Sequence, residues 1–128
     1  MGPNKVVVQF KDGTVMKGST TDFLPNKACF HLNSQNETVE TIEVEALKAL
    51  FFVKDVDGNK DYNETYQDVI QGGGKRIQVE FNDGETIVGY VLGYSPDRQG
   101  FNLTPADLNS NNERIFVVTS ATKSVIFA

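Results

Sequence analysis

The sequence predicts an all-β protein made of two small five-stranded barrels in tandem, and three observations support this prediction. First, residues 5–32 align without a gap to residues 76–103, so the chain contains an internal repeat. Second, each copy begins with alternating apolar and polar residues, the period of a half-buried strand. Third, this stretch is followed in each copy by Asp-Gly, which is typical of a tight hairpin turn.

The repeat is well supported, because the identical positions are turn glycines, prolines and apolar residues of the expected core. Eight of the 28 aligned pairs are identical: Val8/Val79, Phe10/Phe81, Asp12/Asp83, Gly13/Gly84, Gly18/Gly89, Pro25/Pro96, Phe30/Phe101 and Leu32/Leu103. After Leu32 the offset between the copies grows from 71 to 75, so the second copy has four extra residues in the following loop.

Length and composition exclude several classes of protein. A chain of 128 residues with 39% hydrophobic and 23% charged residues is typical of a folded domain. The net charge of -5 argues against a protein whose main role is nucleic-acid binding. One Cys and one His do not complete a zinc site, and no apolar run is long enough to cross a membrane. We therefore expect a protein without a cofactor and without a membrane partner.

The strands follow one another in the same order in both copies. After the hairpin turns, second strands are expected over residues 14–21 and 85–93, where Gly18 and Gly89 indicate a bulge or a sharp bend. Residues 40–52 would suit a helix or a strand. The matching segment 114–119 is rich in β-branched residues, so we predict a strand in both copies.

The domain boundaries follow from the repeat. Residues 1–54 form the first barrel and residues 75–128 the second, with a linker over residues 55–74 that is first acidic and then glycine-rich. Asn63 could cap a short helix over residues 63–70. We expect the two barrels to pack against each other about a pseudo-two-fold axis.

The glycine spacing resembles the Sm-like fold, a strongly bent five-stranded barrel related to SH3-like barrels. The segments Gly13-Thr-Val-Met-Lys-Gly18 and Gly84-Glu-Thr-Ile-Val-Gly89 keep the spacing of that family. The resemblance implies a barrel whose edge strands can associate with other copies. The RNA-binding residues of that family are not present at the matching positions, which weakens an RNA-binding role.

Two further segments resemble an uncharacterised bacterial family that contains tandem copies of this unit. They are residues 48–55 and 110–114. This resemblance implies a bacterial protein in a cytoplasmic setting and assigns no activity.

The acidic linker contains a weak candidate for a calcium site. With Gly58 at the glycine position of an EF-hand loop, four acidic residues fall on ligand positions: Asp55, Asp57, Asp61 and Glu64. Val53 stands where the first Asp is needed, and a solvated acidic linker explains the same residues.

The loops after the second strands are candidate binding loops. Phe23 and Lys27 in the first copy match Tyr94 and Arg98 in the second, with Pro96 between the latter two. An aromatic ring and an arginine could stack a base or grip a carboxylate. A proline turn capped by an aromatic side chain explains the same pattern. A second candidate contact loop contains Asn111, Asn112 and Arg114.

Together these features predict a non-catalytic binding or scaffolding module that contacts a protein partner or further copies of itself through its barrel edges. The alternative is a single-stranded RNA-binding protein that uses the Tyr94 and Arg98 loop. An enzyme is not expected, because the sequence shows no convergent set of titratable groups.

Overall fold

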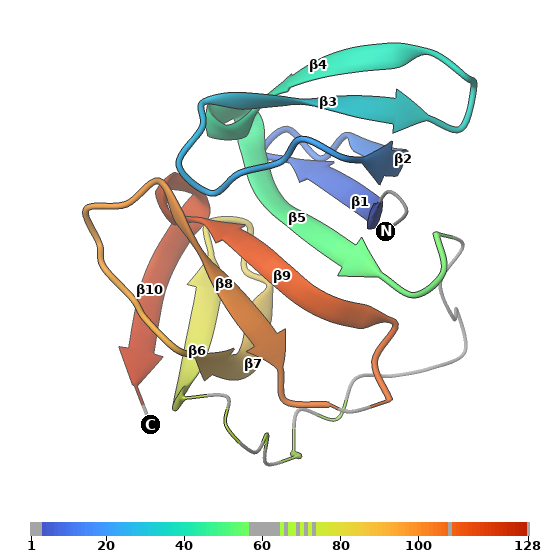
Figure 1. Ribbon diagram of the computed structural model, residues 1–128. Coiled ribbons are helices and arrows are strands. Elements are labelled where there is room, and N and C mark those ends of the chain that lie inside the picture. Colours follow the sequence, from blue (N-terminus) through green and yellow to red (C-terminus); the bar gives the residue numbers. More distant parts are fainter. Residues whose placement is uncertain are drawn as a thin grey trace.

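The part of the chain that the structure describes forms ten antiparallel strands and two single turns of 3₁₀ helix (Figure 1). The computed structural model describes residues 4–56, 65, 67, 68, 70, 72, 74–107 and 109–127. The elements of the first half are β1 (Asn4–Phe10), β2 (Val15–Thr20), β3 (Cys29–Ser34), β4 (Val39–Glu43), η1 (Val44–Ala46) and β5 (Leu47–Val53). Those of the second half are β6 (Lys75–Phe81), β7 (Thr86–Val91), β8 (Gly100–Pro105), β9 (Asn112–Val118), η2 (Thr119–Ala121) and β10 (Thr122–Phe127). The predicted all-β class is confirmed.

The two halves repeat the same strand order. The complete sheet runs β10-β6-β7-β8-β9-β5-β1-β2-β3-β4, so the order β5-β1-β2-β3-β4 of the first half reappears as β10-β6-β7-β8-β9 in the second. The first hairpin of each half turns at a glycine with a positive φ, 93° at Gly13 and 94° at Gly84. The preceding Asp12 and Asp83 accept the N–H groups of Thr14 and Glu85. The local sequence signal thus explains both turns.

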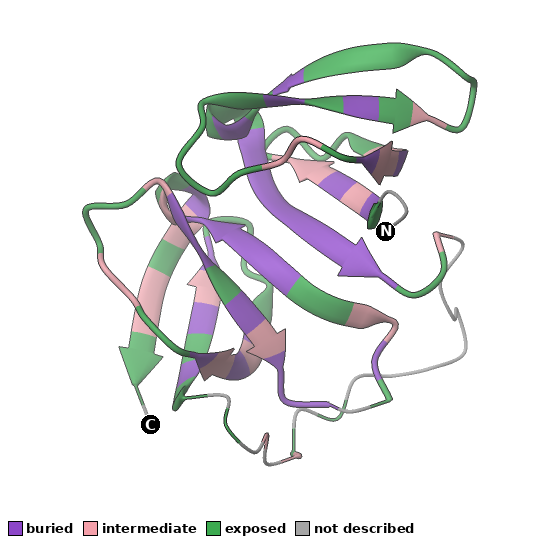
Figure 2. Cartoon of the chain, viewed as in Figure 1, coloured by how far each residue is buried: buried purple, intermediate pink, exposed green. Residues whose placement is uncertain are grey.

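Strands β5 and β9 join the halves, and each is shared between two hydrophobic cores. Leu50 and Phe52 of β5 face the core of the first half, whereas Ala49, Phe51 and Val53 face that of the second. The same alternation holds on β9, because Phe116 and Val118 belong to the first core and Ile115 and Val117 to the second. Figure 2 shows β5 buried along its length. A strand with both faces covered explains the unbroken apolar run that looked ambiguous in the sequence.

The expected pseudo-two-fold axis is wrong. An axis of this kind would exchange β5 with β10 and β9 with β4, so the β5–β9 pair would require an equivalent β10–β4 pair. Instead, β10 and β4 are the two outer edges of the sheet. The halves are therefore joined head to tail through non-equivalent strands. Among the described residues, no pairing of β4 with β5 or of β9 with β10 is seen, so the closure of each half into a barrel stays a prediction.

Gly18 and Gly89 do not mark bulges, because the registers of β1–β2 and β6–β7 pass through them without a shift. A Cβ on Gly18 would lie 2.1 Å from the carbonyl oxygen of Asn33. At Gly89 it would lie 2.4 Å from the carbonyl oxygen of Thr104. These glycines are thus required by the close approach of the third strand of each half.

The described part of the linker runs along the second half. The backbone N–H of Asp68 donates to the carbonyl of Ala106, and that of Thr65 donates to the carboxylate of the buried Asp107. Thr65, Gln67, Asp68 and Ile70 have no helical conformation, and the other positions of the predicted helix lie outside the described residues. Within the described ranges, no helix has the length and apolar character that crossing a membrane requires.

Candidate functional site

The two predicted binding loops form matching turns. The N–H of Lys27 donates to the carbonyl of Leu24 at 3.1 Å, and that of Arg98 donates to the carbonyl of Ser95 at 3.2 Å. In each turn a proline occupies the first central position, where its fixed φ favours this geometry. Pro96 therefore shapes the loop.

The aromatic side chains that precede these turns pack against the cores. The ring centroid of Phe23 lies 5.3 Å from that of Phe30 and 4.9 Å from that of Phe116. The ring of Tyr94 has centroid distances of 4.9 Å to Phe101 and 5.6 Å to Phe127. Phe23 thus covers core rings, and Tyr94 packs between the core ring of Phe101 and the exposed ring of Phe127. These contacts weigh against base stacking by either residue.

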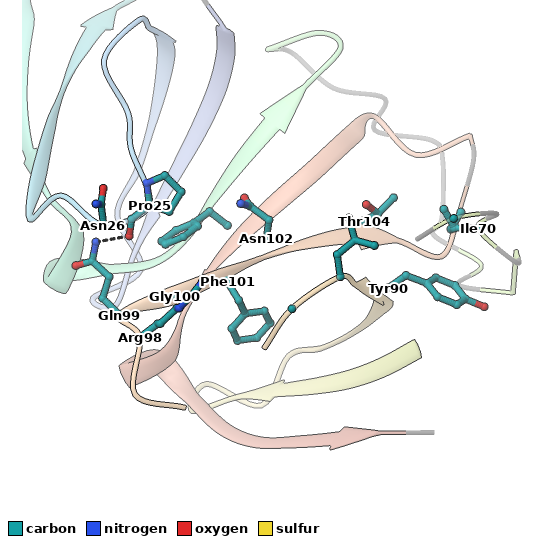
Figure 3. A pocket seen from close by; sticks show the side chains of 14 residues that line it. Pro25, Asn26, Ile70, Tyr90, Arg98, Gln99, Gly100, Phe101, Asn102 and Thr104 are labelled. Carbon is teal, nitrogen blue, oxygen red and sulfur yellow. Dashed lines mark hydrogen bonds between the residues drawn. The ribbon is translucent and has the colours of Figure 1, made fainter. Parts of the chain in front are cut away.

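Arg98 lies on an open cleft of about 1080 Å³ between the halves. Figure 3 shows Asn26 and Gln99 at one end of this cleft, Tyr90 and Ile70 at the other, and Asn102 and Thr104 between them. Of the described residues that line it, Arg98 is the charged one. The structure therefore separates Arg98, which lines the cleft, from Phe23 and Tyr94, which do not.

The turn of the first half closes one end of the cleft. The side-chain amide of Gln99 donates to the carbonyls of Pro25 and Lys27, at 2.7 and 2.6 Å. Gln99 thus ties the exposed turn that carries Lys27 to the second half, which gives the cleft a wall from each half.

The first half contains a carboxylate–imidazole pair that the sequence analysis did not identify. Oδ1 of Asp22 accepts the backbone N–H of His31 at 2.9 Å, and Oδ2 lies 2.6 Å from Nδ1 of the same residue. The hydrogen bond from the His31 ring, followed by that from its backbone, lowers the pKa of Asp22 from 3.8 to about 2. This position therefore stabilises an ionised carboxylate.

The second predicted contact loop has structural roles. The side chain of Asn111 accepts the N–H of Asp55 at 3.0 Å and donates to its carbonyl at 2.8 Å, so it fixes the start of the linker. Asn112 begins β9 and donates its N–H to the hydroxyl of Ser110. The pairing of β5 with β9, which joins the two halves, is called the joint below. The guanidinium of Arg114 on β9 lies 4.0 Å from the ring centroid of Phe52 on β5, a cation–π contact across the joint.

A second charged contact also crosses the joint. Nζ of Lys48 on β5 lies 2.7 Å from Oδ2 of Asp83 and contacts Glu85, both in the first hairpin of the second half. The Lys48 side chain is 10% exposed. Burial lowers the pKa of Lys48, but its hydrogen bonds to the two carboxylates outweigh burial and raise it above the ordinary value.

The candidate calcium site is largely outside the described residues, because Asp57, Asp61 and Glu64 all lie there. Asp55 is described, and its backbone is held by Asn111. Within the described ranges, no three side chains of His, Cys, Asp or Glu gather in a way that could hold a metal ion.

Comparison with known proteins identifies the family. The family of unknown function DUF6982 matches residues 2–128, which is nearly the whole chain. The chain belongs to the DUF6982 family. No curated protein and no solved structure matches it. Membership of DUF6982 assigns no activity, so the function must be argued from the residues described above.

Sequence reasoning missed the residues that differ between the copies. Asp22 and His31 are matched, 71 positions later, by Gly93 and Asn102. A search for identical residues passes over these positions. The replacement of Asp22 by Gly93 could still have indicated a site, because it removes a hydrogen-bond acceptor from one copy of a repeated backbone.

Proposed function

We propose that this protein is a non-catalytic scaffolding module of two Sm-like barrels that assembles with further copies of itself through its edge strands. One observation carries the proposal. The two halves are joined by pairing β5 with β9, and the equivalents of these strands, β10 and β4, are the outer strands of the sheet, with no further strand paired to them among the described residues. The joint within the chain can therefore be repeated between chains.

The internal joint predicts the register of the external one. In the joint, Leu50 lies opposite Phe116, Phe51 opposite Ile115 and Phe52 opposite Arg114. With the offset of 75 between the halves, Val125 would lie opposite Thr41 of a second copy. Ile126 would then face Glu40, and Phe127 would face Val39, of that copy.

Burial supports this arrangement. At the internal joint, Phe51 and Phe52 are 7% and 5% exposed. Their equivalents Ile126 and Phe127 are 57% and 47% exposed. Exposed apolar residues on a sheet edge favour pairing with another strand.

Charge supports the same arrangement. Lys123 is the equivalent of Lys48, and Asp12 is the equivalent of Asp83. In a repeated joint, Lys123 would meet Asp12 of a second copy as Lys48 meets Asp83 within the chain.

The external joint should be weaker than the internal one. Thr41 and Glu43 of β4 stand where β9 has Phe116 and Val118, which enter the first core. Less apolar area is therefore buried when β4 takes the place of β9. We expect association to depend on protein concentration.

Light scattering over a wide range of protein concentration tests the proposal. The wild-type protein should increase in mass with concentration, and Lys123→Glu should weaken this association at least tenfold. Combining Lys123→Glu with Asp12→Lys should restore it, because the reversed pair has the same attraction. A wild-type protein that stays monomeric at every concentration would overturn the proposal, and RNA binding by that monomer would favour the alternative function.

Cysteine cross-linking tests the register in a background where the exposed Cys29 is replaced by Ser. Glu40→Cys and Ile126→Cys, placed on separate chains, should form a disulfide between them under mild oxidation. Glu43→Cys with Ile126→Cys is the register-shifted control and should cross-link at least tenfold more slowly. Equal rates for the two pairs would contradict the predicted register.

A further inference from the structure

One position of the repeat is occupied by a carboxylate in the first half and is open in the second. In the first half, β2 and β3 pair at only two positions, Gly18 with Ser34 and Ser19 with Asn33. Beyond these pairs the strands diverge, and the Asp22 carboxylate accepts the N–H of His31 in the space between them. The strands β7 and β8 of the second half likewise pair at only two positions, Gly89 with Pro105 and Tyr90 with Thr104.

The backbone of Asn102 repeats that of His31. His31 lies opposite Thr41, and Asn102 lies opposite Phe116, its equivalent. The hydrogen bond from Val44 to Ala28 in the first half also recurs, from Thr119 to Gln99 in the second. Because hydrogen-bonding groups alternate along an antiparallel strand, the N–H of Asn102 points away from β9, as the N–H of His31 points away from β4.

The second half has lost the internal acceptor for this N–H. Gly93 stands where the first half has Asp22, and a Cβ built on Gly93 would meet nothing within 4 Å. Gly93 and Asn102 both line the open cleft. Figure 3 shows Asn102 in the middle of it. Among the residues that the structure describes, no acceptor is seen for the N–H of Asn102, and this residue is exposed. The N–H is therefore open to water or to a ligand, as N–H groups on the edge of a strand are.

The cleft also contains donors and a positive charge suited to an anion. The side-chain amide of Asn102 provides two further N–H groups at an exposed position. Arg98 is exposed and lines this cleft as well as a neighbouring hollow beside Pro96 and Ser120, so it brings a positive charge to the edge of the cleft. Tyr90 and Leu92 provide apolar surface beside these groups.

We propose that the cleft of the second half binds a carboxylate-bearing ligand, whose carboxylate takes the position that Asp22 occupies in the first half. It accepts the backbone N–H and the side-chain amide of Asn102, while Arg98 provides the opposite charge. The neighbouring apolar surface favours a carboxylate attached to an apolar group. Two sources share this chemistry: the end of a peptide chain and an acidic side chain.

In the first half, the His31 ring and then the His31 backbone N–H lower the pKa of Asp22. Asn102 repeats the backbone donor and has a side-chain amide in place of the ring. No residue of β4 or β10 lines the cleft. The proposed ligand binding and the proposed self-assembly therefore use different surfaces, and each can be tested without the other.

An NMR titration of the full chain labelled with ¹⁵N tests the proposal. N-acetyl-leucine represents a chain end, N-acetyl-aspartyl amide an acidic side chain, and N-acetyl-leucinamide has no carboxylate. At least one of the two acids should move the Asn102 amide proton downfield in a saturable manner, and the uncharged amide should not. The acid that binds more tightly identifies the source. The proposal is overturned if neither acid shifts this resonance at about 10 mM, where even weak sites fill.

Gly93→Asp provides the decisive variant, because it rebuilds the internal carboxylate in a space that is free of other atoms. Without ligand, its Asn102 amide should already lie downfield, and its affinity for the better acid should fall at least tenfold. Gly93→Ala is the matched control and should bind within about twofold of wild type, since it adds the Cβ without the acceptor. Unchanged affinity in Gly93→Asp, or an equal loss in Gly93→Ala, would contradict the proposal.

Discussion

Asp22 shows at the scale of a single residue how the fold depends on pH. Its pKa is about 2 in the folded protein, against an ordinary value of 3.8, mainly because the His31 ring donates a hydrogen bond to it. A carboxyl whose pKa is lowered by folding stabilises the folded state at pH values above its ordinary pKa. This stabilisation is lost as the pH falls toward about 2, the pKa in the folded protein. Asp22→Asn should therefore lower the free energy of unfolding near neutral pH.

The expected loss is less than about 1 kcal/mol, because the Asp22 side chain is 41% exposed and solvent screens its interactions. Urea unfolding of the wild type and the variant at a series of pH values measures it. The difference between the two proteins should shrink as the pH falls from about 4 to about 2. A difference that is constant over this range would show that the interaction does not depend on the charge of Asp22.

Gly18 supports a second prediction at this scale. Gly18→Ala should lower the free energy of unfolding by about 3 kcal/mol, because its Cβ would lie 2.1 Å from a backbone oxygen of β3. Gly13→Ala is the control. It has a φ of 93° with open space around it, so strain alone should cost about 1 kcal/mol. Chemical denaturation of both variants measures which one loses more free energy of unfolding. A larger loss in Gly13→Ala than in Gly18→Ala would show that the backbone of β3 can move away from the added Cβ.

At the scale of elements, local sequence predicts strands and turns well. The Asp-Gly turns, the alternating first strands and the two proline turns form where their residues indicate. Of the two roles predicted for Gly18 and Gly89, the bulge is wrong, and the close approach of the third strand was not predicted. A bulge and a close approach both require glycine, and only the neighbouring strand distinguishes them. The same limit applies to Phe23 and Tyr94, whose packing against Phe116 and Phe101 depends on the folded structure.

The contact of β5 with the first hairpin of the second half predicts an asymmetry between two kinds of variant. Asp83→Asn combined with Glu85→Gln leaves the buried Lys48 ammonium without an ionic partner. This double variant should lower the free energy of unfolding by about 2 kcal/mol. The loss is smaller than for a wholly buried pair, because both carboxylates are half-exposed. Lys48→Met removes the charge, and with it the cation–π contact of Nζ 4.8 Å from the ring centroid of Phe81, but it keeps an apolar side chain of similar length at this position. Because no unpaired charge remains buried, this variant should stay within about 1 kcal/mol of wild type. Thermal unfolding compares them, and a larger loss in Lys48→Met would contradict this account.

At the scale of the whole molecule, the repeat predicts that two similar halves exist but not how they join. The repeat by itself does not determine which edge strand of one half pairs with which edge strand of the other. It is compatible with a two-fold arrangement as well as with the observed pairing of β5 with β9. The signal that was present is the difference between the copies. Segment 115–118 is apolar at every position, whereas segment 39–43 mixes polar and apolar residues and has one buried residue, Ile42. These patterns suit a central strand and an edge strand respectively.

Sharing of strands predicts that the first half cannot fold alone. A fragment of residues 1–54 lacks β9, so Phe116 and Val118 are missing from its core and Phe51 is uncovered. We expect no cooperative unfolding transition for this fragment by circular dichroism, whereas the full chain should unfold in one transition. A dispersed NMR spectrum from the isolated fragment would contradict this prediction.

The shared strands also affect how the protein is made in the cell. Residue 53 ends β5, and β9 begins only at residue 112. At typical rates of translation of about 5–20 residues per second, the ribosome needs about 3–12 s to add the segment between them. During that interval the newly made β5 carries Phe51 without its cover. The acidic stretch that follows it, made in those same seconds, places like charges beside the open strand, which is the kind of sequence that keeps nascent chains from pairing with one another.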